Sequence, residues 1–309
     1  MPQNFQDRLA AAIQRCRTPA VVGIDPVYES LPPALRREQP TVRQAADQVH
    51  AFCRTLIDIA AAHAPAVKLN SAFFEALYEH GVATYYRLVR HAHARGLLVI
   101  GDIKRGDIGS TARLYARGHL AAPPFADVDA DCIPDAVTLA GYLGEGAVRP
   151  FVEAAAAGGR GVYVLVRPSD PGADEIHGFG GPAGRAFYQH MAELVARWGG
   201  GAALVGQCGL SCVGAVVAPK DAASTSALRN TMPVTPWLVP GYGAQGAGVE
   251  ACRPCFLPGG RGAIINASRS VIYAFSRPEL AARGSQDWEA CVDRACAAFA
   301  ADVAPLAGC

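Results

Sequence analysis

Acidic and basic residues alternate in one short segment, Asp102-Ile-Lys104-Arg-Gly-Asp107. Side chains two positions apart on a β-strand point to the same side, so Asp102 and Lys104 would face one way at a strand end. Lys68 closes another apolar segment and can meet them there. Opposite charges a few ångströms apart keep both groups ionised. A lysine held in this way can stabilise developing negative charge and supply a proton. The alternative is a buried ion-pair network that only joins strands.

A second group of residues could bind phosphate. The turn Gly241-Tyr-Gly-Ala-Gln245-Gly246 is rich in glycine, and Arg269 follows one apolar segment later. Glycines let backbone N–H groups approach an anion, and a guanidinium group adds paired, charge-assisted hydrogen bonds. An ordinary turn and a surface arginine would give the same pattern.

Eight short apolar segments, separated by turns and by stretches of helical pattern such as Ser71–Arg95 and Phe187–Trp198, could carry these residues. Nearly continuous apolar strands are typical of a parallel sheet that is buried on both faces. Eightfold strand–helix alternation predicts a (β/α)8 (TIM) barrel, with a doubly wound open sheet as the alternative. The expected strands are Ala20–Asp25, Pro65–Asn70, Leu97–Lys104, Asp135–Leu139, Gly161–Arg167, Val213–Pro219, Pro236–Pro240 and Gly262–Asn266.

In such a barrel the active site lies at the carboxyl ends of the strands, and phosphate commonly binds after strands seven and eight. Polar residues occur at six of the expected strand ends. They are Asp25, Lys68 with Asn70, the segment from Asp102 to Asp107, Ser169, Gln245 and Arg269. The barrel therefore predicts that the charged residues and the phosphate-binding residues lie together around its carboxyl end, which we call the mouth.

The 309 residues predict a single domain, 1–309, with loop insertions near 168–184 and 199–212 that are rich in Gly and Pro. The formal net charge is +1, with 28 basic and 27 acidic residues, which argues against a nucleic-acid partner. No apolar run reaches the roughly 18 residues of a membrane span, and the N-terminus lacks a signal-peptide pattern. We therefore expect a cytoplasmic protein.

The ten cysteines are expected to be reduced thiols, because they are spread over a long chain with no secretory signal. Cys252-Arg-Pro-Cys255 is the one redox-like pair. It lies in a stretch rich in Gly and Pro, whereas a thioredoxin-type pair follows a strand and opens a helix, so the pattern favours a structural role.

The segment VIGDIKRGDIGSTA, which contains the charged residues, resembles the orotidine 5′-phosphate decarboxylase family, in its longer-chain bacterial (type 2) branch. Similar segments follow in the order of that family over about residues 20–275: VVGIDP, VKLNSAFFE, DAVTLAGYLG, GVYVLVRPSDPG, LVPGYGAQG and INASRS. The resemblance implies a carboxy-lyase of pyrimidine biosynthesis that converts orotidine 5′-monophosphate to UMP and CO2. It implies no cofactor and no metal.

The resemblance also implies roles for individual residues. Lys68, Asp102, Lys104 and Asp107 match the catalytic Lys–Asp–Lys–Asp array of the family, in which Lys104 donates a proton to C6 of the pyrimidine. Asp107 with its neighbours Ile108 and Thr111 would reach into the site of a second subunit, which implies a homodimer with shared active sites. The remaining substrate-binding residues would be Asp25, Asn70, Ser169, Gln245 and Arg269.

Two positions depart from the family pattern. Arg167-Pro168 precedes Ser169 where many relatives have Thr-Ser-Asn-Pro, and Ser268 stands where a glycine often precedes the phosphate arginine.

Two other functions remain open at this point. One is a sugar-phosphate lyase or decarboxylase of the same barrel superfamily, which would use Mg²⁺; the cations of Lys68 and Lys104 would oppose that ion. The other is an inactive barrel that only binds a nucleotide, which the complete charged array disfavours.

Overall fold

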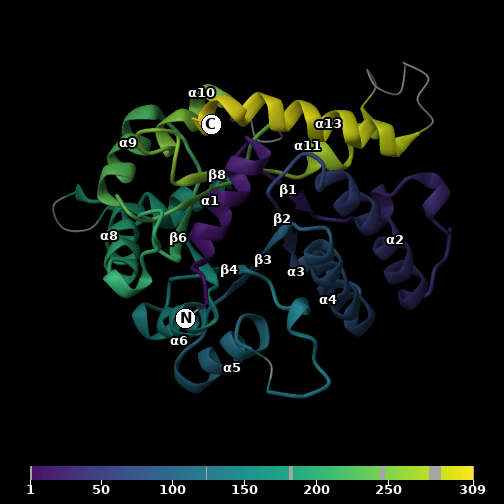
Figure 1. Ribbon diagram of the computed structural model, residues 1–309, viewed down its shortest axis with the longest axis horizontal. Coiled ribbons are helices and arrows are strands. Elements are labelled where there is room, and N and C mark those ends of the chain that lie inside the picture. Colours follow the sequence, from purple (N-terminus) through teal and green to yellow (C-terminus); the bar gives the residue numbers. More distant parts are fainter. Residues whose placement is uncertain (1, 123, 181–183, 244–247, 278–286, 309) are drawn as a thin grey trace.

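The computed structural model describes residues 2–122, 124–180, 184–243, 248–277 and 287–308. Eight parallel strands form a closed barrel in sequence order, and helices surround it (Figure 1). The predicted (β/α)8 barrel is confirmed, and the open-sheet alternative is wrong. Each strand overlaps one of the eight predicted segments: β1 Ala20–Ile24, β2 Ala66–Asn70, β3 Leu98–Arg105, β4 Ala136–Leu139, β5 Gly161–Arg167, β6 Val213–Val217, β7 Trp237–Val239 and β8 Ala263–Ala267.

The helices of the described residues pack outside the strands, apart from α1. None combines the length and apolarity needed to cross a membrane. Their bounds are α1 Phe5–Cys16, α2 Val42–Ala60, α3 Ser71–Glu75, α4 Tyr78–Ala94, α5 Gly109–His119, α6 Glu145–Gly158, α7 Asp174–His177, α8 Phe187–Gly199, α9 Ala222–Thr231, α10 Val249–Cys252, α11 Arg269–Ile272 and α13 Trp288–Val303.

The stretch Ser71–Arg95 is helical as expected, but it is divided into two helices, α3 and α4. Tyr78 takes a left-handed conformation, with φ at 52°, where α4 begins. Gly81 then lies so close to α3 that a Cβ atom there would be 1.9 Å from the Phe74 carbonyl oxygen. The chain therefore turns tightly between the two helices, and the apolar pattern does not reveal this turn.

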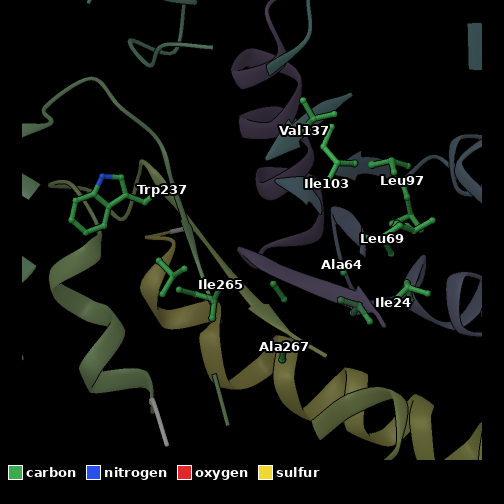
Figure 2. Packing of buried hydrophobic residues seen from close by; sticks show 14 of the residues in the cluster. Ile24, Ala64, Leu69, Leu97, Ile103, Val137, Trp237, Ile265 and Ala267 are labelled. Carbon is green, nitrogen blue, oxygen red and sulfur yellow. The ribbon is translucent and has the colours of Figure 1, made fainter. Parts of the chain in front are cut away.

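Two apolar clusters build the core. The larger fills the space between the barrel strands and the outer helices, and part of it appears in Figure 2. The smaller joins inward-facing strand residues, among them Ile100, Ala136 and Tyr163, with Phe5 and Leu9 of α1. Helix α1 therefore closes the amino-terminal end of the barrel, across which it runs in Figure 1.

The insertion near 199–212 holds α1 in this position. The Asp7 carboxylate accepts the backbone N–H groups of Gln207 and Cys208 at 3.1 and 2.8 Å. The Asn4 side chain donates to the Leu204 carbonyl oxygen at 3.0 Å. This glycine-rich segment thus lies at the end of the barrel opposite the predicted active site.

Candidate active site

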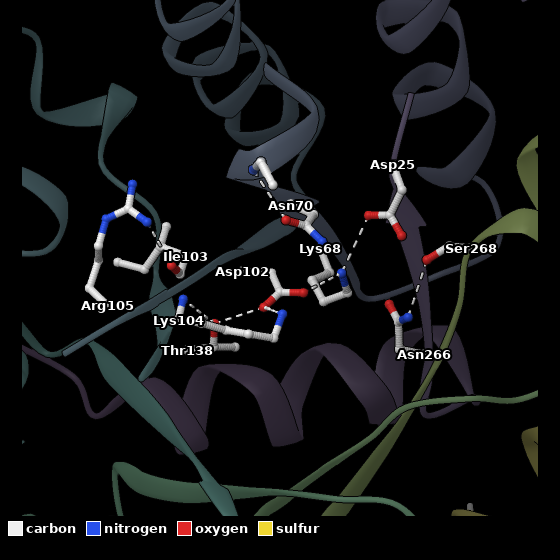
Figure 3. A network of polar contacts seen from close by, with 11 residues as sticks. Asp25, Lys68, Asn70, Asp102, Ile103, Lys104, Arg105, Thr138, Asn266 and Ser268 are labelled. Atoms are coloured by element: carbon white, nitrogen blue, oxygen red, sulfur yellow. Dashed lines mark hydrogen bonds and ion pairs between the residues drawn. The ribbon is translucent and has the colours of Figure 1, made fainter. Parts of the chain in front are cut away.

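The pleat of neighbouring strands places three polar side chains together. Ala66, Ile100 and Ala136 belong to the inner apolar cluster. Side chains two residues further along each strand face the same interior, and these are Lys68, Asp102 and Thr138. All three are buried, and they lie one layer nearer the carboxyl ends of the strands (Figure 3).

Asp102 is the centre of the array. Its Oδ2 atom lies 2.8 Å from Lys68 Nζ, and its Oδ1 atom lies 2.5 Å from Lys104 Nζ. Lys68 Nζ also lies 3.4 Å from Asp25 Oδ1, which brings the end of β1 into the network. Thr138 donates its hydroxyl to Asp102 Oδ1 at 2.8 Å. The predicted contact between Lys68, Asp102 and Lys104 is therefore present.

The charges of this network stabilise one another. Burial alone would lower the pKa of Lys68, but the carboxylates of Asp102 and Asp25 raise it above its usual value. Burial alone would raise the pKa of Asp102, but the ammonium groups of Lys68 and Lys104 hold it well below its usual range. Both groups consequently stay ionised, as close opposite charges require.

Lys104 differs from Lys68 in exposure. The Lys104 side chain is 46% exposed, against 7% for Lys68, so its ammonium group can meet a ligand at the mouth. Its backbone adopts a left-handed conformation with φ at 45°, which is uncommon for a residue other than glycine. The Lys104 N–H donates to Thr138 Oγ1 at 3.0 Å, which helps to hold this conformation. The strand end thus presents a cation at a fixed place.

Asp107 does not join this network within the chain. Its Oδ1 atom accepts the Ile108 backbone N–H at 2.7 Å, on the turn after β3. Ile108 is 65% exposed and Thr111 is exposed on α5. Asp107, Ile108 and Thr111 therefore lie beside the mouth of the barrel. They take no part in the contacts between Lys68, Asp102 and Lys104.

The other predicted substrate-binding residues surround the same end of the barrel. Asn70 ends β2, and its side-chain oxygen accepts the Ala72 N–H at 3.2 Å. Ser169 is half-buried just after β5, and Arg269 is exposed at the start of α11. Gln245 lies outside the described residues.

Three residues at the site were not singled out from the sequence. Thr138 is one of them. The alternation of side chains along β4 could have revealed it, because Thr138 is a polar residue on the inward-facing side of that strand. Asn266 of β8 is buried; its amide nitrogen donates to Ser268 Oγ at 3.3 Å, and its oxygen has no partner among the described residues. Tyr273 Oη accepts the Val27 N–H at 2.6 Å, which joins the loop after β1 to the chain after β8.

The structure gives physical reasons for the two departures from the family pattern. Arg167 is buried, stacks 4.5 Å from the ring centre of Tyr188 and donates to Ser224 Oγ at 2.8 Å. It therefore ties the end of β5 to the outer helices. Ser268 packs against Gly23, where a Cβ atom would lie 1.8 Å from its hydroxyl oxygen.

The Cys252–Cys255 pair has the properties of structural thiols. Both residues are buried and free, and burial raises the pKa of Cys252 to about 11 and that of Cys255 still further. A reactive thiol needs a lowered pKa and some exposure. In the described part of the chain, no group of three or more His, Cys, Asp or Glu residues could hold a metal ion.

Known proteins resemble this chain over most of its length. The family profile described as orotidine 5′-phosphate decarboxylase / HUMPS matches residues 21–284. An orotidine 5′-phosphate decarboxylase of Rhodopirellula baltica is 36% identical over 294 residues, which cover 93% of this chain and 94% of that protein. One from Caldicellulosiruptor saccharolyticus is 31% identical, over 88% and 90% of the two chains.

Solved structures resemble the chain in fold as well. A Streptomyces avermitilis protein superimposes with a TM-score of 0.79 and 31% identity, over 100% of this chain and 97% of the other. An OMP decarboxylase of Leishmania donovani gives a TM-score of 0.70 at 26% identity, over 94% and 99%. The length of the match and the shared barrel establish that this chain belongs to the orotidine 5′-phosphate decarboxylase / HUMPS family.

Proposed function

We propose that the protein decarboxylates orotidine 5′-monophosphate to UMP in the cytoplasmic synthesis of pyrimidines, as one domain that spans the chain. The observation that carries this proposal is the Lys68–Asp102–Lys104 contact at the mouth of the barrel. The names of the Rhodopirellula and Caldicellulosiruptor relatives support the substrate.

The reaction needs a cation where charge develops. When the bond between C6 and the carboxylate breaks, its electron pair stays on C6, in an orbital that the pyrimidine ring delocalises poorly. A preorganised ammonium group near C6 stabilises that charge. Lys104 then transfers a proton from Nζ to C6, which gives UMP and a neutral amine. Asp102 holds the side chain of Lys104 in place beforehand, and Lys68 balances the charge of Asp102.

Binding of the phosphate is assigned to Arg269 together with the glycine-rich turn that contains Gln245. Arg269 is exposed at the mouth and pairs with no carboxylate of the described chain, so its guanidinium group is free for an anion. Asp25, Asn70 and Ser169 would contact the ribose and the pyrimidine. Phosphate held far from C6 can supply binding energy that lowers the barrier at the reacting carbon.

The functional unit is proposed to be a homodimer in which Asp107, Ile108 and Thr111 enter the partner's site. Apolar side chains exposed on and beside the turns after β3 and β4 support this arrangement, because monomers seldom expose such groups together. They are Ile108, Leu114, Tyr142 and Leu143. Asp107 would then complete an array whose other members come from the opposite chain.

The proposal is tested by following the loss of orotidine 5′-monophosphate by absorbance, with and without EDTA. We expect activity that EDTA does not change, and we expect Lys104→Ala to reduce turnover by at least about 10²-fold, the lower range for a positioned proton donor. Circular dichroism would check that the variant folds. If Lys104→Ala kept a tenth of the activity, the assignment would be wrong. Activity lost with EDTA would point to the metal-dependent sugar-phosphate chemistry.

A further inference from the structure

A cavity lies at the opposite end of the barrel from Lys104. It has a volume of about 640 Å³ and opens between α1 and the segments that precede β6, β7 and β8. These segments contribute Cys208, Pro236 and the glycine-rich stretch 259–262. Small-molecule sites usually enclose about 300–1,000 Å³, so the cavity can hold a ligand of ordinary size.

The charge of the lining is positive. Arg17 and Arg261 both line the cavity, and none of the described residues that line it is an aspartate or a glutamate. Neither arginine forms an ion pair within the described residues; Arg261 donates only to the Cys208 carbonyl oxygen, at 3.2 Å. The carboxylate of Asp7, close by, is already engaged by backbone N–H groups of the 199–212 segment. Two exposed guanidinium groups are therefore available to an anion.

The rest of the lining suits the partly apolar body of an organic ligand. Ile13 and Leu210 give apolar surface, while the amides of Gln6 and Gln14 give donors and acceptors. Gln6 donates to Tyr163 Oη at 3.2 Å, so the floor of the cavity is held by the barrel interior. Apolar walls with a few placed polar groups are the usual composition of a ligand pocket.

We propose that this cavity is a second, non-catalytic site that binds a small organic anion. The ligand carries a ring that rests between Ile13 and Leu210, and a phosphate or carboxylate group that Arg17 and Arg261 hold. Guanidinium groups suit both anions because they donate paired hydrogen bonds. The site is distinct from the mouth at which Lys104 acts, since it lies beneath the closing helix α1.

The probe is 8-anilinonaphthalene-1-sulfonate, which combines an aromatic body with an anionic group, measured by fluorescence titration. N-phenyl-1-naphthylamine, the same body without the sulfonate, measures the contribution of charge. The variants are Arg17→Ala with Arg261→Ala, the cavity-filling Ala10→Trp, and the control Arg43→Ala, an exposed arginine on α2. Saturating UMP is added to occupy the active site.

We expect the double arginine variant to weaken binding of the sulfonate by about tenfold or more, the loss for a charged hydrogen bond, and to leave the neutral probe unchanged. Ala10→Trp should weaken both probes, and Arg43→Ala should weaken neither. All variants should decarboxylate substrate normally, since none touches the mouth. Equal sulfonate affinity in the wild type and the double variant would overturn the proposal, as would displacement of the probe by UMP or no effect of Ala10→Trp.

Discussion

Thr138 connects the two residues on which the proposed chemistry depends. Its hydroxyl donates to Asp102 and accepts the backbone N–H of Lys104. A single oxygen thus orients the carboxylate that holds the ammonium group of Lys104, the proposed proton donor, and supports the left-handed backbone of that residue. Such a residue acts through positioning, because it need not touch the substrate itself.

Thr138→Val should therefore lower kcat by about 10- to 100-fold, since small displacements of a catalytic group are costly, while KM changes little. Steady-state kinetics and a thermal melt would measure both effects. Thr235→Val is the matched control: Thr235 is equally buried, but its hydroxyl has no partner within the described residues. A KM increase with an unchanged kcat would contradict the positioning role.

Arg269 tests the proposed phosphate site. Arg269→Ala removes a bidentate, charge-assisted contact, so kcat/KM should fall by at least about 100-fold. A substrate analogue that lacks the phosphate should react at the same low rate with the wild type and the variant. Arg43→Ala, an exposed arginine on α2 and remote from the strand ends, is a suitable control. Unchanged kinetics with the nucleotide would place the phosphate elsewhere.

At the scale of elements, the sequence predicted the repeated strands and helices of the barrel, but it did not predict the individual turns and loop contacts that occur only once. The strands were predictable because each is a nearly continuous apolar run. The contact between Asp102 and Lys104 was predictable because side chains alternate along a strand. The break at Tyr78 was not, since it depends on a close approach of two helices. Nor was the role of 199–212, because a glycine-rich segment carries no pattern that reveals its partner, here α1.

The amino-terminal end of the barrel contains a charged cluster that makes stability depend on pH. His93 Nε2 lies 2.9 Å from Asp135 Oδ2, and its Nδ1 lies 2.7 Å from the Asp131 carbonyl oxygen. Both neighbours are acceptors, so they favour the imidazolium form. Burial alone would lower the pKa of His93, but Asp135 raises it above its usual value.

The contribution of this pair is fully present below the unfolded pKa of about 6.5, and it is lost as the pH rises through the higher folded pKa. His93→Gln should therefore cost about 1–2 kcal/mol more of the free energy of unfolding at pH 5.5 than at pH 9. Urea denaturation at the two values measures the difference. Ala94→Gln, an exposed change at the next position of the same helix, removes no titratable group and should show no such dependence. An equal cost at both pH values would mean that the pair is not charged.

At the scale of the whole molecule, the single chain supplies only part of the proposed array. Lys68, Asp102 and Lys104 meet within one barrel, whereas Asp107 caps its own turn beside the exposed Ile108. Burying the apolar groups around that turn against a second copy would bring each Asp107 towards the other chain. A twofold axis makes such an exchange reciprocal, so that both sites are completed together.

This arrangement predicts complementation between inactive variants. Lys104→Ala and Asp107→Ala should each be nearly inactive alone. In a heterodimer of the two, one site carries both changes and the other carries neither. Random pairing of equal amounts should therefore restore up to about a quarter of the wild-type activity per site. Mass-tagged subunits would establish that exchange has occurred, and mixing Lys104→Ala with Lys68→Ala is the control, because those two residues share one chain and no site is repaired. Exchange without recovered activity would show that Asp107 acts within its own chain.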